Sequence, residues 1–308
     1  MKAVILEEYG DKDVLKVAEV DRPKVRESDV LIEVKATSVN PVDWQIRAGY
    51  LQEMIPYEFP LILGWDVAGV VKEVGPKVSK FSVGDEVFAS PDMMRNGTYA
   101  GFVAVDESHL AKKPTNLTFE EAASIPLAGL TAWTSLVSVA NMQSGERVLV
   151  QGGAGGVGSL AIQMAKAKGC WVAATCSEKN VEFLHQLGVD QVINYEEENF
   201  EDVLEPVDIV LDTIGGEVQE RSFKVLKKGG RMPSTTTAPD EDLAKESSVE
   251  GFQVSADHSG ETLDEIRKLI EADKVRPVVG QVLELEDVKA GHEISQTGHA
   301  QGKIVLTV

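Results

Sequence analysis

The central residues Gly153-Ala154-Gly155-Gly156-Val157-Gly158 have the spacing G-x-G-x-x-G, which suits the binding of a nucleotide pyrophosphate. Glycine lets the backbone approach phosphates closely, and a helix that begins in the loop offers unpaired N–H groups and the positive end of its dipole. A glycine turn that binds nothing has the same spacing, so the neighbouring elements decide. An apolar strand, Arg147–Gln151, precedes the loop, and apolar spacing over Val157–Lys168 predicts a helix after it. We therefore predict a dinucleotide site whose phosphates lie against Gly153, Gly155, Gly156 and Val157.

The end of the next predicted strand, Trp171–Thr175, bears on the choice between NADH and NADPH. An NADH site carries an acidic residue there, which accepts a hydrogen bond from the ribose 2′-hydroxyl. This chain has Ser177 and Lys179, whose hydroxyl and positive charge suit a 2′-phosphate. Glu178 lies between them and would favour NADH if its carboxylate faced the ribose, whereas pointed outward it is a solvated charge. Tyr195, after the third strand, is placed to cover the adenosine, and NADPH is the predicted cofactor.

Two regions of different pattern must position these residues. The first hundred residues contain short strand-like runs separated by Gly, Pro and Asp, namely Lys2–Leu6, Val30–Ala36, Val67–Val74 and Glu86–Ala89. A capping box at Thr118–Glu121 marks a change, after which strands and helices alternate as in a doubly wound parallel sheet. Later in the chain, the polar segment Pro239–Ser248 predicts a loop, and Thr262–Ala272 predicts an amphipathic helix.

Composition excludes several classes of protein. The 308 residues carry a formal net charge of −20, which disfavours nucleic acid and anionic membrane surfaces as partners. No apolar run approaches the roughly 18 residues that a membrane span requires. The N-terminus becomes acidic too early for a secretory signal, so the cytoplasm is the expected location. The only cysteines, Cys170 and Cys176, are too few for a structural Cys₄ zinc site and form no disulfide framework.

Eight short stretches, in order along essentially the whole chain, resemble one family of enzymes. They are Asn40–Asp43, Gly64–Val71, Val83–Val87, Gly97–Ala100, Pro126–Trp133, Ala154–Gly158, Asp212–Gly216 and Gly298–Leu306. Together they resemble the zinc-independent quinone oxidoreductases (zeta-crystallin-like) of the medium-chain dehydrogenase/reductase superfamily. This resemblance implies an α/β protein with a GroES-like β-barrel catalytic domain at residues 1–118 and 275–308. An inserted Rossmann domain, a doubly wound parallel sheet that binds NADPH, is expected at residues 119–274, and the family implies a homodimer.

The resemblance also suggests roles for residues outside the glycine loop. Asn40 is expected near the nicotinamide ribose, although an Asn before a Pro is also an ordinary turn residue. Thr131 is expected at the cofactor, or alternatively bonded to its own helix backbone. Tyr50 and Tyr57 are expected to border the substrate cleft, where either phenol could donate a proton or simply form a wall. The family pattern further assigns Thr213 and Ile214 to cofactor binding.

A catalytic zinc is not expected. Zinc-dependent relatives place a Cys where this chain has Asn40, and Gly-His-Glu where it has Gly64-Trp65-Asp66. Without a Lewis acid, the hydride must pass to an acceptor that is already electrophilic, such as a quinone or an α,β-unsaturated carbonyl. Two alternatives remain open: an enoyl-thioester reductase, and an NADPH-binding crystallin-like protein with little catalysis.

The remaining charged and titratable residues suggest structural roles. Asp43 and Arg47 are four residues apart and are expected to form a local pair. The histidines have no spacing typical of metal ligands, and surface or helix-cap positions are predicted for His109, His185, His258, His292 and His299.

Overall fold

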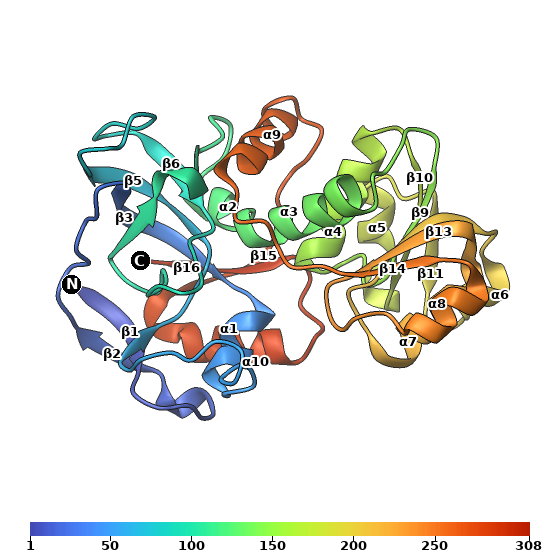
Figure 1. The fold of residues 1–308 in the computed structure, drawn as a ribbon, viewed down its shortest axis with the longest axis horizontal. Coiled ribbons are helices and arrows are strands. Elements are labelled where there is room, and N and C mark those ends of the chain that lie inside the picture. The colour runs from blue at the N-terminus through green and yellow to red at the C-terminus, as the bar shows by residue number, and fades with distance from the viewer. The chain divides into compact units, whose positions relative to one another are not determined.

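The computed structural model describes all 308 residues, and the chain divides into two compact units. The first consists of Met1–Leu127, His258–Ala272 and Pro277–Val308, and the second of Ala128–Asp257 and Asp273–Arg276. This division differs from the predicted one because helices α2 (Phe119–Ala123) and α9 (Gly260–Glu271) belong to the first unit. Helix α9 (Figure 1) packs against the strand β8 (Leu110–Lys112) of that unit. The apolar pattern of a helix does not by itself tell which sheet the helix covers.

The first unit contains two sheets. Its larger sheet has seven strands in the order β15-β16-β3-β5-β6-β8, with β7 also paired to β3. The strands are β15 (Val279–Glu284), β16 (Lys303–Thr307), β3 (Asp29–Val39), β5 (Val67–Val74), β6 (Glu86–Ala89), β8 (Leu110–Lys112) and β7 (Phe102–Asp106). Because β16 pairs antiparallel with β3, the C-terminal tail returns to the N-terminal sheet, as expected of a GroES-like barrel. The smaller sheet joins β2 (Lys16–Glu19), β1 (Lys2–Leu6) and β4 (Leu61–Ile62).

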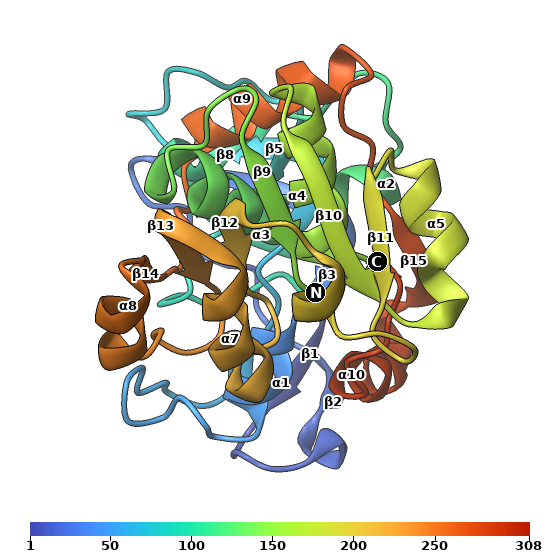
Figure 2. The same ribbon diagram turned by 90° about the vertical axis from the view of Figure 1, so that its right-hand side faces the viewer.

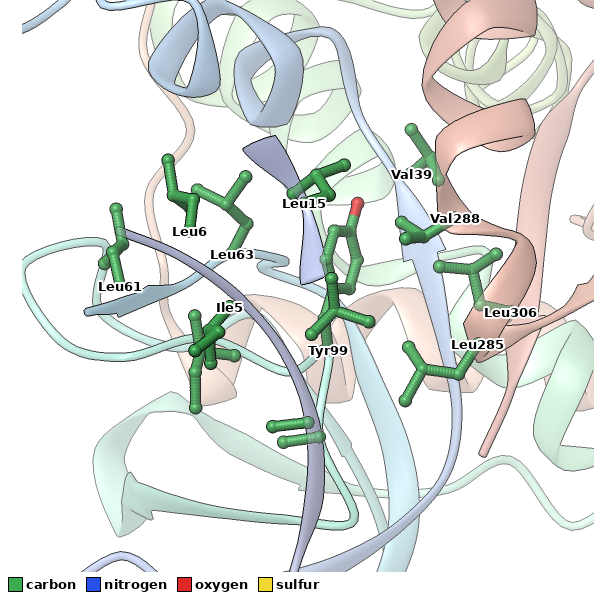
Figure 3. Packing of buried hydrophobic residues seen from close by; sticks show 14 of the residues in the cluster. Ile5, Leu6, Leu15, Val39, Leu61, Leu63, Tyr99, Leu285, Val288 and Leu306 are labelled. Atoms are coloured by element: carbon green, nitrogen blue, oxygen red, sulfur yellow. The ribbon is translucent and has the colours of Figure 1, made fainter. Parts of the chain in front are cut away.

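An apolar core fills the space between the small sheet and the end of the large one. Figure 3 shows side chains from β1, β3, β16 and the helix α10 (Val288–Gln296) in this cluster. Tyr99 lies among them with its ring fully buried. Inside the barrel, a Cβ on Gly69 would lie 2.1 Å from the carbonyl oxygen of Glu33, so the close approach of β3 and β5 requires glycine there.

The second unit is built on a six-stranded parallel sheet. Its order is β11-β10-β9-β12-β13-β14, and the strands β9, β10 and β11 run side by side in Figure 2. The strands are β9 (Arg147–Val150), β10 (Trp171–Cys176), β11 (Gln191–Asn194), β12 (Val207–Leu211), β13 (Leu226–Ser234) and β14 (Glu250–Gln253). The order reverses between β9 and β12, and ligands of doubly wound sheets bind at the carboxyl ends of the strands at such a switch point.

Helices connect these parallel strands and cover the sheet. They are α4 (Gly156–Ala167), α5 (Val181–Gln186), α6 (Phe200–Val203), α7 (Gly216–Ser222) and α8 (Glu241–Ser247). After the capping box at Thr118, the chain forms three short helical segments: α2, α3 (Pro126–Trp133) and a π-helical turn, Thr134–Val139. None of the helices combines the length and apolar character that crossing a membrane would require.

The loop predicted at Pro239–Ser248 is wrong, because α8 occupies most of it. Asp240 caps this helix by accepting hydrogen bonds from the backbone N–H groups of Asp242 and Leu243, each at 2.9 Å. Only Ala244 of the helix is buried, so its polar surface conceals the helical pattern. The capping box at Thr118 is confirmed by both of its bonds with Glu121.

Candidate cofactor and active site

The glycine loop connects β9 to α4 at the switch point of the sheet. Gly152 has φ +70°, a conformation that favours glycine, and Gly155 forms the N-cap of α4 without a side-chain hydrogen bond. A Cβ on Gly158 would lie only 2.3 Å from the carbonyl oxygen of Gly152, so the first turn of α4 contacts the loop closely. The first N–H groups of the helix have no partners within it, and this leaves them available to an anion.

A buried hydrogen-bond network holds this loop to the strands on either side. The backbone N–H of Gly152 donates to Oγ1 of Thr175 at 3.0 Å, and that hydroxyl donates to Oε1 of Gln151 at 2.8 Å. From the other side, the hydroxyl of Thr213 donates to the carbonyl oxygen of Gln151 at 2.8 Å. Gln151 was not among the predicted site residues, although an amide side chain at the end of an apolar strand is a signal for such a role, and here it is buried.

Asp212 shapes the neighbouring loop at the end of β12. Its buried carboxylate accepts from the backbone N–H groups of Ile214 at 3.0 Å and Gly215 at 2.9 Å, and from Nε2 of Gln219 at 2.9 Å. A Cβ on Gly152 would lie 2.8 Å from Oγ1 of Thr213, so the structure brings Thr213 and Ile214 directly beside the glycine loop. Asp212 was part of the recognised motif, but its function as the support of that loop emerges only from these contacts.

The ends of β10 and β11 form the region predicted for the adenosine. Ser177 is buried, and its hydroxyl accepts from Nδ2 of Asn180 at 3.2 Å. The Glu178 carboxylate accepts from Nδ2 of Asn194 at 2.7 Å, so it is turned towards the end of β11. Tyr195 follows directly and is half exposed, and Lys179 is exposed. The structure therefore brings the three predicted residues Ser177, Lys179 and Tyr195 to adjacent strand ends, together with an acid.

Acidic groups dominate the electrostatics of this region. The Glu178 backbone N–H donates to Oε2 of Glu196 at 3.0 Å, which places a second carboxylate next to the first. Burial raises the pKa of Cys176 to about 11, and the negative charges of Glu178 and Glu196 act in the same direction. A bound 2′-phosphate would have to be stabilised against this field, which gives the charge of Lys179 particular weight. Both cysteines are buried free thiols.

In the first unit, Asn40 belongs to a buried polar cluster at the end of β3. Its Nδ2 donates to Oδ2 of Asp66 at 2.7 Å, and its Oδ1 accepts from Nζ of Lys303. Ser38 donates to the same Asp66 oxygen at 2.5 Å, and the backbone N–H of Leu127 donates to Oδ1 of Asp66 at 2.6 Å. Asn40 is thus more than a turn residue, and Asp66 and Lys303 are members of the cluster to which the sequence assigned no role.

A second buried cluster corrects the predicted Asp43–Arg47 pair. Asp43 Oδ2 accepts from the backbone N–H of Asn40 at 2.7 Å and from the Tyr99 hydroxyl at 2.6 Å, while Oδ1 has no partner. Arg47 instead lies 3.1 Å from Nδ1 of His292. Although both residues belong to α1 (Pro41–Arg47), Asp43 contacts Tyr99 and Arg47 contacts α10. Burial raises the pKa of Asp43 to about 7 against the opposing effect of these hydrogen bonds.

The predicted surface position of His292 is also wrong. The side chain is fully buried on α10, with Nε2 3.3 Å from the Tyr99 hydroxyl. Burial, and then the charge of Arg47, lower the pKa of His292 to about 3, so the imidazole is neutral. His258 is partly buried as well, with Nδ1 3.0 Å from the Ser90 hydroxyl. Isolated spacing along a sequence does not reveal such contacts, because all of these partners are distant in the chain.

The predicted tyrosines have different surroundings. Tyr50 is 72 % exposed, and its ring meets Trp44 edge-on with centroids 6.2 Å apart. The Tyr57 hydroxyl donates to the carbonyl oxygen of Met93 at 2.9 Å, and burial raises its pKa well above the usual range. Thr131 lies on α3, where its carbonyl oxygen accepts from the Ser135 hydroxyl at 2.7 Å.

A GroES-like barrel combined with a doubly wound sheet and a glycine loop at its switch point defines an oxidoreductase of the medium-chain dehydrogenase/reductase superfamily. Residues 26–115 match the family described as "Alcohol dehydrogenase GroES-like domain", and residues 187–306 match "Zinc-binding dehydrogenase". The chain belongs to the quinone oxidoreductase family of that superfamily, as its relatives show.

Two relatives and two solved structures illustrate the similarity. The 2-methylene-furan-3-one reductase of Solanum lycopersicum is 38 % identical over 99 % of this chain and 79 % of its own. The chloroplastic NADPH-dependent alkenal/one oxidoreductase of Arabidopsis thaliana is 37 % identical with the same coverage. The Coxiella burnetii quinone oxidoreductase structure has a TM-score of 0.93 and 36 % identity, covering 100 % of this chain and 99 % of its own. The Escherichia coli quinone oxidoreductase complexed with NADPH has a TM-score of 0.89 and 27 % identity over 100 % of both chains.

Proposed function

We propose that this protein is an NADPH-dependent, zinc-independent oxidoreductase that transfers a hydride to a quinone or an α,β-unsaturated carbonyl. The observation that carries the proposal is the glycine loop at the switch point, with the helix α4 beginning at its end. Relatives named as quinone and alkenal/one oxidoreductases, and a related structure that contains NADPH, support it.

The residues of the second unit fit a dinucleotide. Backbone groups of Gly153, Gly155, Gly156 and Val157 would hold the pyrophosphate, with Thr213 and Ile214 beside them. Ser177, Lys179 and Tyr195 would hold the adenosine end, and Asn40 and Thr131 the nicotinamide end. When bound, the cofactor supplies a hydride from its nicotinamide ring. The chain itself orients the reactants and stabilises the negative charge that develops on the acceptor oxygen.

The residues in the Asn40 cluster do not fit zinc, despite the name of the matching C-terminal family. Zinc sites use Cys, His and carboxylate ligands, and a catalytic site needs about three of them. Here a Trp stands at position 65 and an Asn at position 40, and no group of three or more His, Cys, Asp or Glu side chains is arranged to hold a metal ion. The Asp66 carboxylate is already occupied by four donors, one of them the ammonium group of Lys303.

Of the two tyrosines predicted as proton donors, Tyr50 and Tyr57, only Tyr50 is exposed. The Tyr57 hydroxyl already donates to Met93, so it is the weaker candidate. Tyr50 is 72 % exposed, so its side chain is accessible to an acceptor. We propose Tyr50 or bulk water as the proton source, and a Tyr50→Phe variant that lowers kcat with enones but not NADPH affinity would assign the role to the tyrosine.

The decisive experiment follows NADPH oxidation by the purified protein with a panel of quinones, enones and crotonyl thioesters. Turnover of quinones or enones supports the proposal, and turnover of crotonyl thioesters alone would replace it with an enoyl reductase. Tight NADPH binding without turnover of any acceptor would instead indicate a crystallin-like binding protein. Metal analysis of the same sample that finds one zinc per chain would overturn zinc independence.

We also propose a homodimer located in the cytoplasm, with a small-molecule acceptor as its partner. The strongly negative net charge supports the absence of nucleic acid and anionic membrane from the list of partners.

A further inference from the structure

Three neighbouring strands bring a buried lysine to an amide and a carboxylate. Ile304 of β16 lies opposite Val39 of β3, so the preceding residue of β16, Lys303, reaches Asn40. Asp66 immediately precedes β5, the strand on the other side of β3. Lys303 is 6 % exposed, Asn40 is 3 % exposed and Asp66 is fully buried. The sheet register alone therefore places a cation, an amide and an anion in contact at one end of the barrel.

The Lys303 ammonium group has a complete set of partners. It donates to the carbonyl oxygen of Val39 at 3.0 Å, to Oδ2 of Asp66 at 3.2 Å and to Oδ1 of Asn40. An ammonium group has three N–H donors, and these three oxygens account for all of them. The lysine is thus held as a fixed internal cation rather than as a mobile surface charge.

This arrangement determines which way the Asn40 amide points. The oxygen and nitrogen of an amide have similar shapes, so a buried Asn can adopt either of two orientations unless its partners distinguish them. Here the amide oxygen faces an ammonium group and the amide nitrogen faces a carboxylate. The reverse orientation would place like partial charges together on both sides. Of the two N–H groups on Nδ2, one donates to Asp66, and the other has no partner in the structure.

Stability alone does not explain the cluster. Burying an ion pair costs desolvation free energy that the attraction between the charges often fails to recover, and in some proteins buried polar groups instead fix one conformation. The Asp66 carboxylate would also be well satisfied without lysine, because Ser38, Asn40 and the Leu127 backbone all donate to it. Besides its bond to the Val39 carbonyl oxygen, what the lysine adds is the contact with the Asn40 oxygen.

We propose that Lys303 is a positioning residue for the nicotinamide end of the cofactor. Together with Asp66, its ammonium group holds the Asn40 amide in the orientation that presents the remaining N–H to a ribose hydroxyl. Lys303 acts through Asn40 and does not itself touch the reacting atoms. The inference rests on the proposed function, in which Asn40 contacts the nicotinamide ribose.

The test compares two ligands in the Lys303→Met variant. Fluorescence and calorimetric titrations measure the Kd of NADPH and of 2′,5′-ADP, which contains the adenosine end and lacks the nicotinamide. Loss of one oriented hydrogen bond raises the NADPH Kd roughly tenfold, while the Kd of 2′,5′-ADP stays within about twofold of the wild-type value. Lys112→Met is the matched control, because Lys112 is an exposed strand lysine with a 4.0 Å ion pair to Asp85, and both of its Kd values remain unchanged.

A second variant covers the case in which Lys303→Met does not fold. The double variant Lys303→Met/Asp66→Asn removes both buried charges that distinguish the two orientations of the Asn40 amide, so it shows the same selective loss of NADPH affinity. Equal NADPH affinity in either folded variant and the wild type overturns the inference, as does a parallel loss for both ligands. If the wild-type protein binds 2′,5′-ADP but not NADPH, the proposed function itself is wrong. This result is seen in the wild type alone, so it is distinguishable from both variant results that overturn the role of Lys303.

Discussion

At the scale of single residues, the buried cluster around Asp43 contains two groups whose pKa values lie far from their usual range. The pKa of Asp43 is raised to about 7, chiefly by burial, despite hydrogen bonds from Tyr99 and Asn40 and the charge of Lys303. The pKa of His292 is lowered to about 3 by burial and by Arg47. In the folded protein near pH 6, both groups are therefore largely uncharged, and Arg47 carries the charge of this cluster.

Stability should depend on pH through Asp43. Its folded pKa lies above the unfolded value of about 4, so the folded state binds more protons between these values and the free energy of unfolding falls as pH rises from about 4 to about 7. His292 acts in the opposite direction, since its stabilising contribution is lost as pH falls from about 6.5 to about 3. Urea unfolding at half-unit intervals from pH 4 to 8 should show that the free energy of unfolding of the wild type, relative to that of Asp43→Asn, falls by up to about 1.4 kcal/mol per pH unit between about pH 4 and pH 7. A constant difference between variant and wild type at every pH would contradict the raised pKa of Asp43.

In the region proposed for the adenosine, we expect the choice between NADPH and NADH to depend on the adjacent charges of Lys179 and Glu178. Lys179→Met should weaken NADPH binding about tenfold and leave NADH nearly unchanged, because only NADPH carries the 2′-phosphate. Glu178→Gln should instead strengthen NADPH binding by a few fold, since a carboxylate beside the phosphate is removed. Fluorescence titration of both cofactors measures these ratios, and NADH binding as tight as NADPH to the wild-type protein would reject the assignment.

At the scale of the elements, two glycines of one loop serve different purposes. A Cβ at Gly158 would lie 2.3 Å from the Gly152 carbonyl oxygen, whereas a Cβ at Gly155 meets its nearest atom at an ordinary 3.5 Å. Gly158 therefore allows α4 to pack closely on the loop. Gly155 is expected to face the phosphates of the cofactor.

These two positions offer a matched pair of substitutions. Gly158→Ala should lower the free energy of unfolding by about 1–3 kcal/mol, because backbone atoms have to shift. Gly155→Ala should leave the melting temperature nearly unchanged but weaken NADPH binding at least tenfold, since its methyl group occupies the path of the pyrophosphate. Calorimetry and cofactor titration on both variants separate the effects. Equal losses of stability in Gly158→Ala and Gly155→Ala would show that Gly158 has no special function in the packing of α4 on the loop.

At the scale of the whole molecule, the net charge of −20 opposes the approach of an anionic cofactor. Raising the ionic strength from about 10 to about 150 mM shortens the screening length from roughly 30 to roughly 8 Å, which weakens the long-range repulsion more than the contact with Lys179. The NADPH association rate constant in stopped-flow fluorescence should therefore rise with salt by a few fold. A fall of the same size would mean that local positive charge governs the approach.

Much of the fold and the cofactor loop could be read from local patterns. The strands at Lys2–Leu6 and Val67–Val74 and the glycine loop follow from residue types a few positions apart, and the structure has them at the predicted residues. The exposed helix α8 was missed because almost none of its surface is buried, so it lacks the apolar stripe on which recognition depends.

The sequence by itself determined the class of the second unit and the order of its loops, because glycine spacing and alternating strands and helices are local consequences of backbone geometry. Only the tertiary structure decided which buried polar groups meet. The contacts of Asn40 with Asp66 and Lys303 join residues 26 and 263 positions apart. The contacts of Tyr99 with Asp43 and His292 join residues 56 and 193 positions apart. Such pairs depend on sheet register and on the packing of α10, and neither property is encoded in the spacing of neighbouring residues.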